Sequence, residues 1–284
     1  MEQKRVAAIH DISCFGRCSL TVALPIISAA GIETAVIPTA VLSTHTGGFT
    51  GFTYRDLTDD IMPIVDHWIT LGLKFDAIYT GFLGSFEQID IVASVFNKLS
   101  SEKTVIVVDP VMADNGKLYA IFPKDFPEGM RKLCAKADVI MPNITEAVLM
   151  LNEEYTEGPY DRGYIESLLR RLGTIGAKKV VLTGVFFNEE ELGAAAYDAE
   201  TREIGYAFSE RIEGYYHGTG DVFGSVLVAS LVNGRSLNEA VGAAVDFTAG
   251  SIRRTKEAGT DIRFGVNFEG GISKFVSGPG RNNK

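Results

Sequence analysis

The sequence predicts an α/β fold built around a largely parallel sheet. Short apolar runs rich in Val, Ile and Ala alternate with longer segments whose apolar residues recur three and four positions apart, which is the pattern of consecutive β-α-β units. Most of the apolar runs end in polar residues or glycine, as buried parallel strands do. Because no internal repeat and no Pro- or Ser-rich linker interrupts the pattern, we expect one continuous domain over residues 1–284.

The predicted elements follow this alternation along the chain. Buried strands are expected at the short runs of β-branched residues, 6–10, 34–39, 77–80, 104–109, 139–141 and 179–183. Helices are expected at the amphipathic segments, several of which begin with a Ser, Thr, Asp or Asn cap, 19–30, 58–71, 86–99, 125–135, 144–151 and 161–172. A hairpin of residues 193–198 and 203–208 would extend one sheet edge, and a helix pair of residues 220–232 and 237–256 would cover one face.

Two segments depart from the alternation. Residues 39–54 are rich in Gly and Thr and lie between a predicted strand and a predicted helix, so they suggest a small flap. Residues 258–284 are rich in Gly and polar residues, and we expect about the last ten of them to be frayed.

Composition and charge exclude several classes of protein. The net charge of −9 disfavours a nucleic-acid backbone or an anionic membrane surface as partner. The three cysteines support neither a disulfide scaffold nor a zinc site. The apolar run at residues 6–9 is too short for a signal peptide, and Pro and Gly interrupt the longest uncharged stretches, unlike a membrane span. We therefore expect a cytoplasmic protein with no membrane and no nucleic-acid partner.

The strongest local signal for chemistry is the run Gly218-Thr219-Gly220-Asp221 before a predicted apolar helix. Glycines let the backbone approach a phosphate closely, and the free N–H groups and dipole of a helix N-terminus attract anions. A carboxylate beside such a loop makes sense as a base that takes a proton from an attacking hydroxyl. The alternative is that Asp221 is an ordinary N-terminal helix residue.

Two further acids follow predicted strands. Asp109 lies at the tip of one strand, and Glu146 lies three residues after Asn143 in the first turn that follows the next strand. Ligands of open α/β sheets bind at the carboxyl ends of strands, and two carboxylates near a phosphate suggest Mg²⁺. For Glu146 the alternative is a capping box with Asn143. The P-loop, protein-kinase, nucleophile-elbow and zinc-protease motifs are absent from the sequence.

Five motifs, taken in order, resemble the ribokinase-like superfamily and, within it, the pyridoxal (vitamin B6) kinase branch. They are Ser43-Thr44-His45-Thr46, Gly81-Phe82-Leu83-Gly84-Ser85, Asp109-Pro110-Val111-Met112, Pro142-Asn143-Ile144-Thr145-Glu146 and Gly218-Thr219-Gly220-Asp221. The resemblance implies a three-layer α/β/α fold, with a central mostly parallel sheet and helices on both faces. It also implies ATP-dependent phosphorylation of the 5′-hydroxymethyl group of pyridoxal, pyridoxine or pyridoxamine in pyridoxal 5′-phosphate salvage, by a homodimer.

The resemblance assigns a role to each matching residue. Asp221 would be the catalytic base, and Gly218, Thr219 and Gly220 would form the anion hole for the transferred phosphoryl group. Asp109 and, through water, Glu146 would serve Mg²⁺, and a monovalent cation such as K⁺ could assist. The remaining contacts would come from residues at strand ends and in the flap: Asn143, Thr183, Gly184 and Gly220 for ATP, and Asp11, Thr46 and Phe82 for the substrate.

Two positions depart from the pyridoxal kinase pattern. Pyridoxal kinases commonly carry Ser where this sequence has Asp11, and Tyr where it has Phe82. Hydroxymethylpyrimidine kinases resemble this sequence in the same core motifs, but their first loop is richer in glycine than residues 11–16 of this sequence. A hydroxymethylpyrimidine kinase, a sugar or nucleoside kinase of the same superfamily, and a non-enzymatic carrier of a B6 vitamer therefore stay as alternatives.

Overall fold

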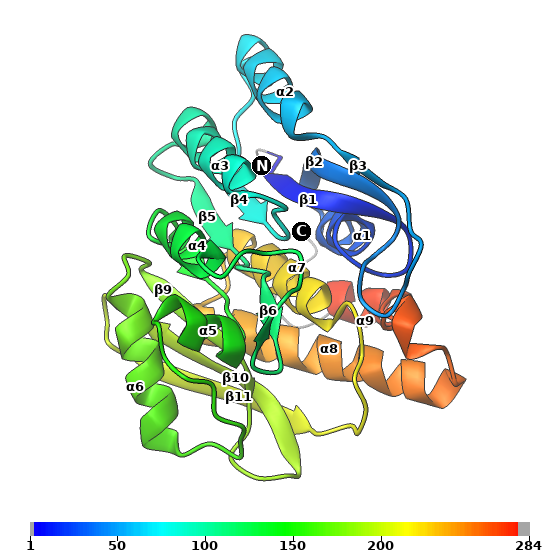
Figure 1. The fold of residues 1–284 in the computed structure, drawn as a ribbon, viewed down its shortest axis with the longest axis vertical. Helices are drawn as coiled ribbons and strands as arrows, with labels where there is room; N and C mark the ends of the chain where they lie inside the picture. Colours follow the sequence, from blue (N-terminus) through cyan, green and yellow to red (C-terminus); the bar gives the residue numbers. More distant parts are fainter. Residues whose placement is uncertain (1–2, 278–284) are drawn as a thin grey trace.

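A nine-stranded sheet in the order β11-β10-β9-β8-β5-β4-β1-β2-β3 forms the centre of the computed structural model, which describes residues 3–277 (Figure 1). Its strands are β1 (Arg5–Phe15), β2 (Glu33–Thr44), β3 (Tyr54–Asp56), β4 (Ala77–Thr80), β5 (Val105–Val108), β8 (Val139–Ile140), β9 (Lys179–Val185), β10 (Glu191–Asp198) and β11 (Ile204–Glu210). The six strands from β2 to β9 in this order pair in parallel, whereas β3 and β10 are antiparallel to their neighbours and β11 is antiparallel to β10. Two short strands, β6 (Ala113–Asp114) and β7 (Lys117–Leu118), form a separate hairpin.

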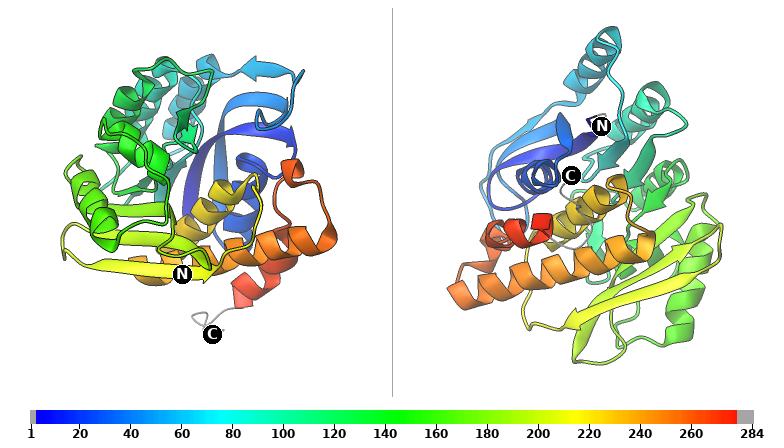
Figure 2. Two further views of the ribbon diagram at one scale, coloured as in Figure 1. Left: turned by 60° about the horizontal axis from the view of Figure 1, so that its bottom comes forward. Right: turned by 180° about the vertical axis from the view of Figure 1, so that it is seen from behind.

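Helices cover both faces of the sheet. One face carries α2 (Thr58–Thr70), α3 (Phe86–Leu99), α4 (Phe126–Cys134), α5 (Ile144–Met150) and α6 (Arg162–Gly173). The other face carries α1 (Leu20–Ala29), α7 (Thr219–Val232) and α8 (Leu237–Ala258), and Figure 2 shows this arrangement from two further directions.

The strand residues alternate between two hydrophobic cores, as the period of two residues in a strand requires. In β1, Val6 packs with α1, α7 and α8, whereas Ala7 and Ile9 pack with the helices of the opposite face. Each layer therefore has an apolar contact with the sheet. The predicted α/β fold with a mostly parallel sheet and helices on both faces is confirmed.

The two strands at the start of the chain are longer than predicted. The sequence predicts strand ends at His10 and Thr39, but β1 continues to Phe15 and β2 to Thr44. Their register shifts between His10 and Ile12, so Asp11 lies at a bulge, after which pairing resumes. These extensions contain polar residues, so they do not form the continuous apolar runs that predict a buried strand. The predicted flap segment 39–54 begins inside β2.

The C-terminal segment carries more structure than its composition predicts. After α8 come two short 3₁₀ turns, Ile262–Phe264 and Glu269–Gly271, and the helix α9 (Ile272–Ser277). The turn Glu269–Gly271 lies against α8, and α9 lies against that turn and against α1. Residues 275–277 are therefore helical where fraying is expected; the rest of that expectation falls on residues 278–284, outside the described residues. Within residues 3–277, no helix is both long and apolar enough to cross a membrane.

Candidate active site

The glycine loop, residues 218–220, forms the N-terminus of α7. Gly218 is the N-cap and has φ 75°, the left-handed region in which glycine is favoured. A Cβ atom at Gly218 would lie 2.0 Å from the carbonyl oxygen of Arg17, whereas a Cβ at Gly220 would meet open space. The loop thus packs tightly against residue 17 on one side and leaves room beside the N–H groups of the first turn, where an anion can bind.

Asp221 lies in this first turn and is partly buried. The Cys18 thiol donates a hydrogen bond to its Oδ2 at 3.3 Å. Burial raises the pKa of Asp221 to about 6 and the charge of Asp11 adds to the rise, while the Ser19 amide and the Cys18 thiol lower the pKa. A carboxylate with such a pKa is ionised at neutral pH and is still a useful proton acceptor.

Asp11 occupies the β1 bulge and is almost wholly buried. Ser19 Oγ donates to its Oδ1 at 2.5 Å, and Ser13 Oγ donates to its Oδ2 at 3.1 Å. Burial raises the pKa of Asp11, and these hydroxyl donors oppose the rise. The charge of Asp11 in turn raises the pKa of Asp221, so the two carboxylates interact electrostatically.

Asp109 and Glu146 form a second pair of buried acids. Burial and the charges of Glu146 and Asp221 raise the pKa of Asp109 well above its usual range. Glu146 accepts the N–H of Asn143 through Oε2 at 2.9 Å and the N–H of Met112 through Oε1 at 3.1 Å. Burial nevertheless raises the pKa of Glu146 to about 8. Glu146 completes the capping box with Asn143. It also lies close enough to Asp109 to raise the pKa of that carboxyl, so the structure is compatible with both interpretations of Glu146, the cap and the magnesium site.

Asn143 and Thr183 lie at the carboxyl ends of neighbouring strands and form an isolated parallel bridge. The side chain of Asn143 accepts the N–H of Glu146 at 2.9 Å and donates to the carbonyl of Ala113 at 2.9 Å. Gly184 follows Thr183 at an irregularity in the pairing with β10 and has φ 74°. These residues, Asp109, Glu146 and Asp221 all lie at one end of the parallel strands.

The other predicted substrate residues are less closely connected. Phe82 follows β4 and packs against Phe122, with ring centroids 5.7 Å apart. Thr46 is exposed in the loop after β2, and the structure shows no contact between it and Asp11 or Phe82. His45, one residue earlier, is buried and bonds the carbonyl of Arg263 through Nε2 at 2.6 Å.

Residues that sequence reasoning missed complete the site. Cys18 and Ser19 connect Asp221 with Asp11, although no motif marks either of them. The Arg17 N–H donates to the carbonyl of Phe264 at 2.9 Å, which brings the segment after α8 to the same place. No local pattern could have revealed the contacts of Cys18 with Asp221 and of Arg17 with Phe264, because the partners are more than 200 positions apart in the chain.

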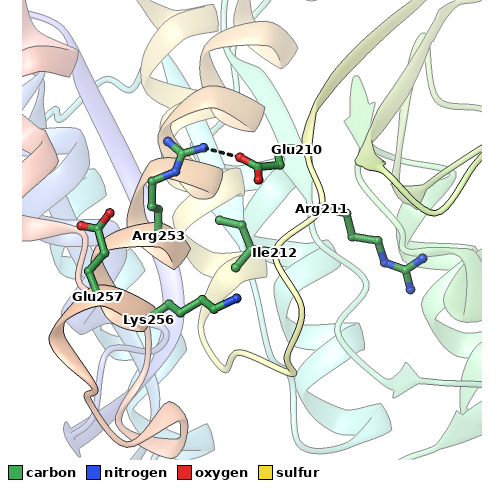
Figure 3. A pocket seen from close by; sticks show the side chains of 6 residues that line it. All are labelled: Glu210, Arg211, Ile212, Arg253, Lys256 and Glu257. Carbon is green, nitrogen blue, oxygen red and sulfur yellow. Dashed lines mark hydrogen bonds and ion pairs between the residues drawn. The ribbon is translucent and has the colours of Figure 1, made fainter.

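A surface hollow of about 280 Å³ lies beside the segment that leads from β11 to the glycine loop. Figure 3 shows Glu210, Arg211 and Ile212 on one side and residues from the end of α8 on the other. Its arginines already have carboxylate partners: Arg253 pairs with Glu210 at 3.3 Å, and Arg211 pairs with Glu189. Both arginines are therefore already paired, and Lys256 is the remaining cation that lines the hollow.

Comparison with known proteins agrees with this geometry. Residues 24–265 match the phosphomethylpyrimidine kinase family. A pyridoxine kinase of Bacillus subtilis is 30% identical over 189 residues, which cover 66% of this chain and 67% of the relative.

Two solved structures share the whole architecture. A Bacteroides thetaiotaomicron protein, provisionally named a phosphomethylpyrimidine kinase and determined with pyridoxal, is 38% identical with a TM-score of 0.92, covering 96% of each chain. Pyridoxal kinase from Lactobacillus plantarum is 31% identical with a TM-score of 0.87, covering 97% of each chain. The predicted resemblance to kinases of hydroxymethyl-pyridines and pyrimidines is confirmed, and the chain belongs to the phosphomethylpyrimidine kinase family.

Proposed function

We propose that this protein transfers the γ-phosphoryl group of ATP to the 5′-hydroxymethyl group of pyridoxal, pyridoxine or pyridoxamine. The observation that carries the proposal is the position of Asp221, a partly buried carboxylate in the first turn of α7, beside the free N–H groups that follow Gly218. Such an arrangement suits a hydroxyl that must lose a proton while it attacks a phosphoryl group.

In the proposed mechanism Asp221 accepts the proton of the substrate hydroxyl. The charge that develops on the transferred group is stabilised by the N–H groups of Gly218, Thr219 and Gly220 and by the positive end of the α7 dipole. Asn143, Thr183 and Gly184 lie at neighbouring strand ends and contact the ATP phosphates.

The acids after β5 and β8 fit a magnesium ion that is bound together with substrate phosphates. Among residues 3–277 no three His, Cys, Asp or Glu side chains cluster as a metal site, but Mg²⁺ needs only one or two carboxylates when phosphates and water complete its shell. Within residues 3–277 no group donates a hydrogen bond to the Asp109 carboxylate, whereas both carboxylate oxygens of Glu146 accept backbone N–H groups. Asp109 would therefore be a direct ligand and Glu146 would act through water; the ion would neutralise phosphate charge.

The substrate would lie between the carboxyl end of β1 and the loop after β4. Asp11 supplies a polar contact to the ring, Phe82 an aromatic face, and Thr46 a contact from the segment 39–54, which acts as a flap. We further propose that the chain is a single kinase domain that works as a cytoplasmic homodimer, and that a monovalent cation such as K⁺ can assist.

The test is ADP release with MgATP against pyridoxal, pyridoxine, pyridoxamine, hydroxymethylpyrimidine and ribose, for the wild type and Asp221→Asn. We expect turnover of the pyridines, and a loss of about 10²- to 10⁴-fold in the variant. Asp246→Asn is the matched control, because Asp246 is an exposed aspartate of α8. Full turnover by Asp221→Asn would refute the assignment of the base.

The substrate panel also separates the alternatives. Turnover of the pyrimidine alone would make the protein a hydroxymethylpyrimidine kinase, a candidate that the family match and Phe82 in place of Tyr favour. Turnover of ribose alone would make it a sugar kinase. Binding of a pyridine without ADP release would favour a carrier.

A further inference from the structure

A chain of polar contacts joins the two carboxylates of the candidate site. Cys18 Sγ donates to Asp221 Oδ2 at 3.3 Å, and Ser19 Oγ lies 3.7 Å from Cys18 Sγ while it donates to Asp11 Oδ1 at 2.5 Å. We propose that Cys18 is a positioning residue for Asp221: its S–H group holds one carboxylate oxygen and leaves the other free to accept the substrate proton. The inference rests on the proposed role of Asp221 as base.

The backbone around Cys18 is held firmly against the glycine loop. The Cys18 N–H donates to Thr21 Oγ1 at 3.2 Å, and the preceding Arg17 N–H donates to the Phe264 carbonyl at 2.9 Å. The Arg17 carbonyl lies so close to Gly218 that no Cβ would fit between them. The position of the thiol relative to the N-terminus of α7 is therefore set by contacts on both sides of Cys18.

Ser19 shows the backbone strain that accompanies this arrangement. Its φ of 53° and ψ of −128° are unusual for a residue with a side chain. In this conformation its amide lowers the pKa of Asp221 while its hydroxyl donates to Asp11. The dipeptide thus provides donors to both carboxylates, which would otherwise only repel each other.

Cys18 remains a hydrogen-bond donor at neutral pH. Burial, followed by the charges of Asp221 and Asp11, raises the pKa of its thiol well above the usual range. The titratable groups that face Asp221 are Asp11 and Cys18 from β1 and the loop after it, Tyr79 from β4, and Asp109 after β5. None of the four can carry a positive charge, so neutral donors such as the thiol are what stabilises ionised Asp221.

The first test compares kcat against pH for Cys18→Ala and Cys18→Ser. Removing a donor from an ionised carboxylate raises its pKa. We therefore expect the acid limb of Cys18→Ala to move up by about one pH unit, with about tenfold lower turnover below the limb and an unchanged KM for the pyridine. Cys18→Ser should return the limb to the wild-type position or below, because a hydroxyl is a stronger donor. Cys14→Ala, an exposed cysteine of the same segment, should leave the profile unchanged.

The second test does not depend on turnover. The Asp221 carboxyl carbon, assigned by its loss in Asp221→Asn, is titrated by ¹³C NMR in the wild type, Cys18→Ala and Cys18→Ser. A higher pKa in the alanine variant that serine reverses supports the proposal, whereas an equal pKa in all three proteins overturns it. Absence of turnover with any pyridine, together with a normal Cys18-dependent titration, would overturn only the proposed function.

Discussion

At the scale of single residues, Gly218 combines a positive φ with a close approach of two backbones. We expect Gly218→Ala to lower the free energy of unfolding by about 2 kcal/mol or more, because left-handed backbone alone costs alanine about 1 kcal/mol and the methyl group would also collide with Arg17. The KM for ATP should rise as the loop shifts.

Gly234→Ala is the matched control for this substitution. Gly234 also has a positive φ, 86°, but a Cβ there meets nothing within 4 Å. Urea unfolding should show a loss of only about 1 kcal/mol, with an unchanged KM for ATP. Equal losses in the two variants would mean that the contact with Arg17 contributes nothing.

Asp221 should also reduce the stability of the folded protein. Its pKa is about 6 in the folded state against an ordinary value of 3.8, so the folded protein holds the proton more tightly than the unfolded chain does. The ionised carboxylate therefore opposes folding above pH 6, and its effect disappears below pH 3.8. We expect Asp221→Asn to raise the free energy of unfolding by about 1 to 3 kcal/mol at pH 8 and not at pH 3.5. Urea titrations at both pH values test this; a gain that is independent of pH would contradict it.

At the scale of elements, α5 and α8 both begin with a capping box, but only the box of α5 is near the candidate site. Asn143→Ala should cost about 1 to 2 kcal/mol of stability and also raise the KM for MgATP, because the Asn143 side chain accepts the Glu146 N–H and donates to the Ala113 carbonyl. Ser236→Ala should cost about 1 kcal/mol and leave KM unchanged. Thermal unfolding and initial rates distinguish the two, and an equal effect on KM would argue against a role for Asn143 in nucleotide binding.

At the scale of the whole molecule, one sheet separates two hydrophobic cores. If the domain unfolds as a unit, a cavity in either core should shift the same transition. Leu227→Ala on α7 should cost about 2 to 5 kcal/mol, and it should move the fluorescence transition of Trp68, the single tryptophan, which packs on the opposite face.

Urea unfolding of the wild type and Leu227→Ala is followed by Trp68 fluorescence and by circular dichroism, and the two signals should give the same transition midpoint in each protein. Leu24→Ala, which removes an exposed leucine of α1, should change stability by less than about 0.5 kcal/mol. If the midpoint of the Trp68 fluorescence transition were unchanged in Leu227→Ala, the two faces would unfold independently.

The whole fold also explains what the sequence could predict. Buried strands such as β4 and β5 are continuous apolar runs, so composition alone located them, and the glycine loop was recognisable because its residues are contiguous. The extension of β1 past His10 and the exposed three-residue β3 depend on pairing with other strands. The sequence assigns no role to Cys18 for the same reason, since its partner Asp221 is 203 positions away.

The bond between Arg17 and Phe264 has a consequence for the making of the protein. The N-terminal part of a chain leaves the ribosome first and begins to fold while synthesis continues. The loop after β1 emerges before most of the fold, yet its partner at Phe264 is synthesised almost 250 residues later. A growing chain that already contains every motif residue up to Asp221 would still lack this closure, so activity should appear only after translation has passed residue 264.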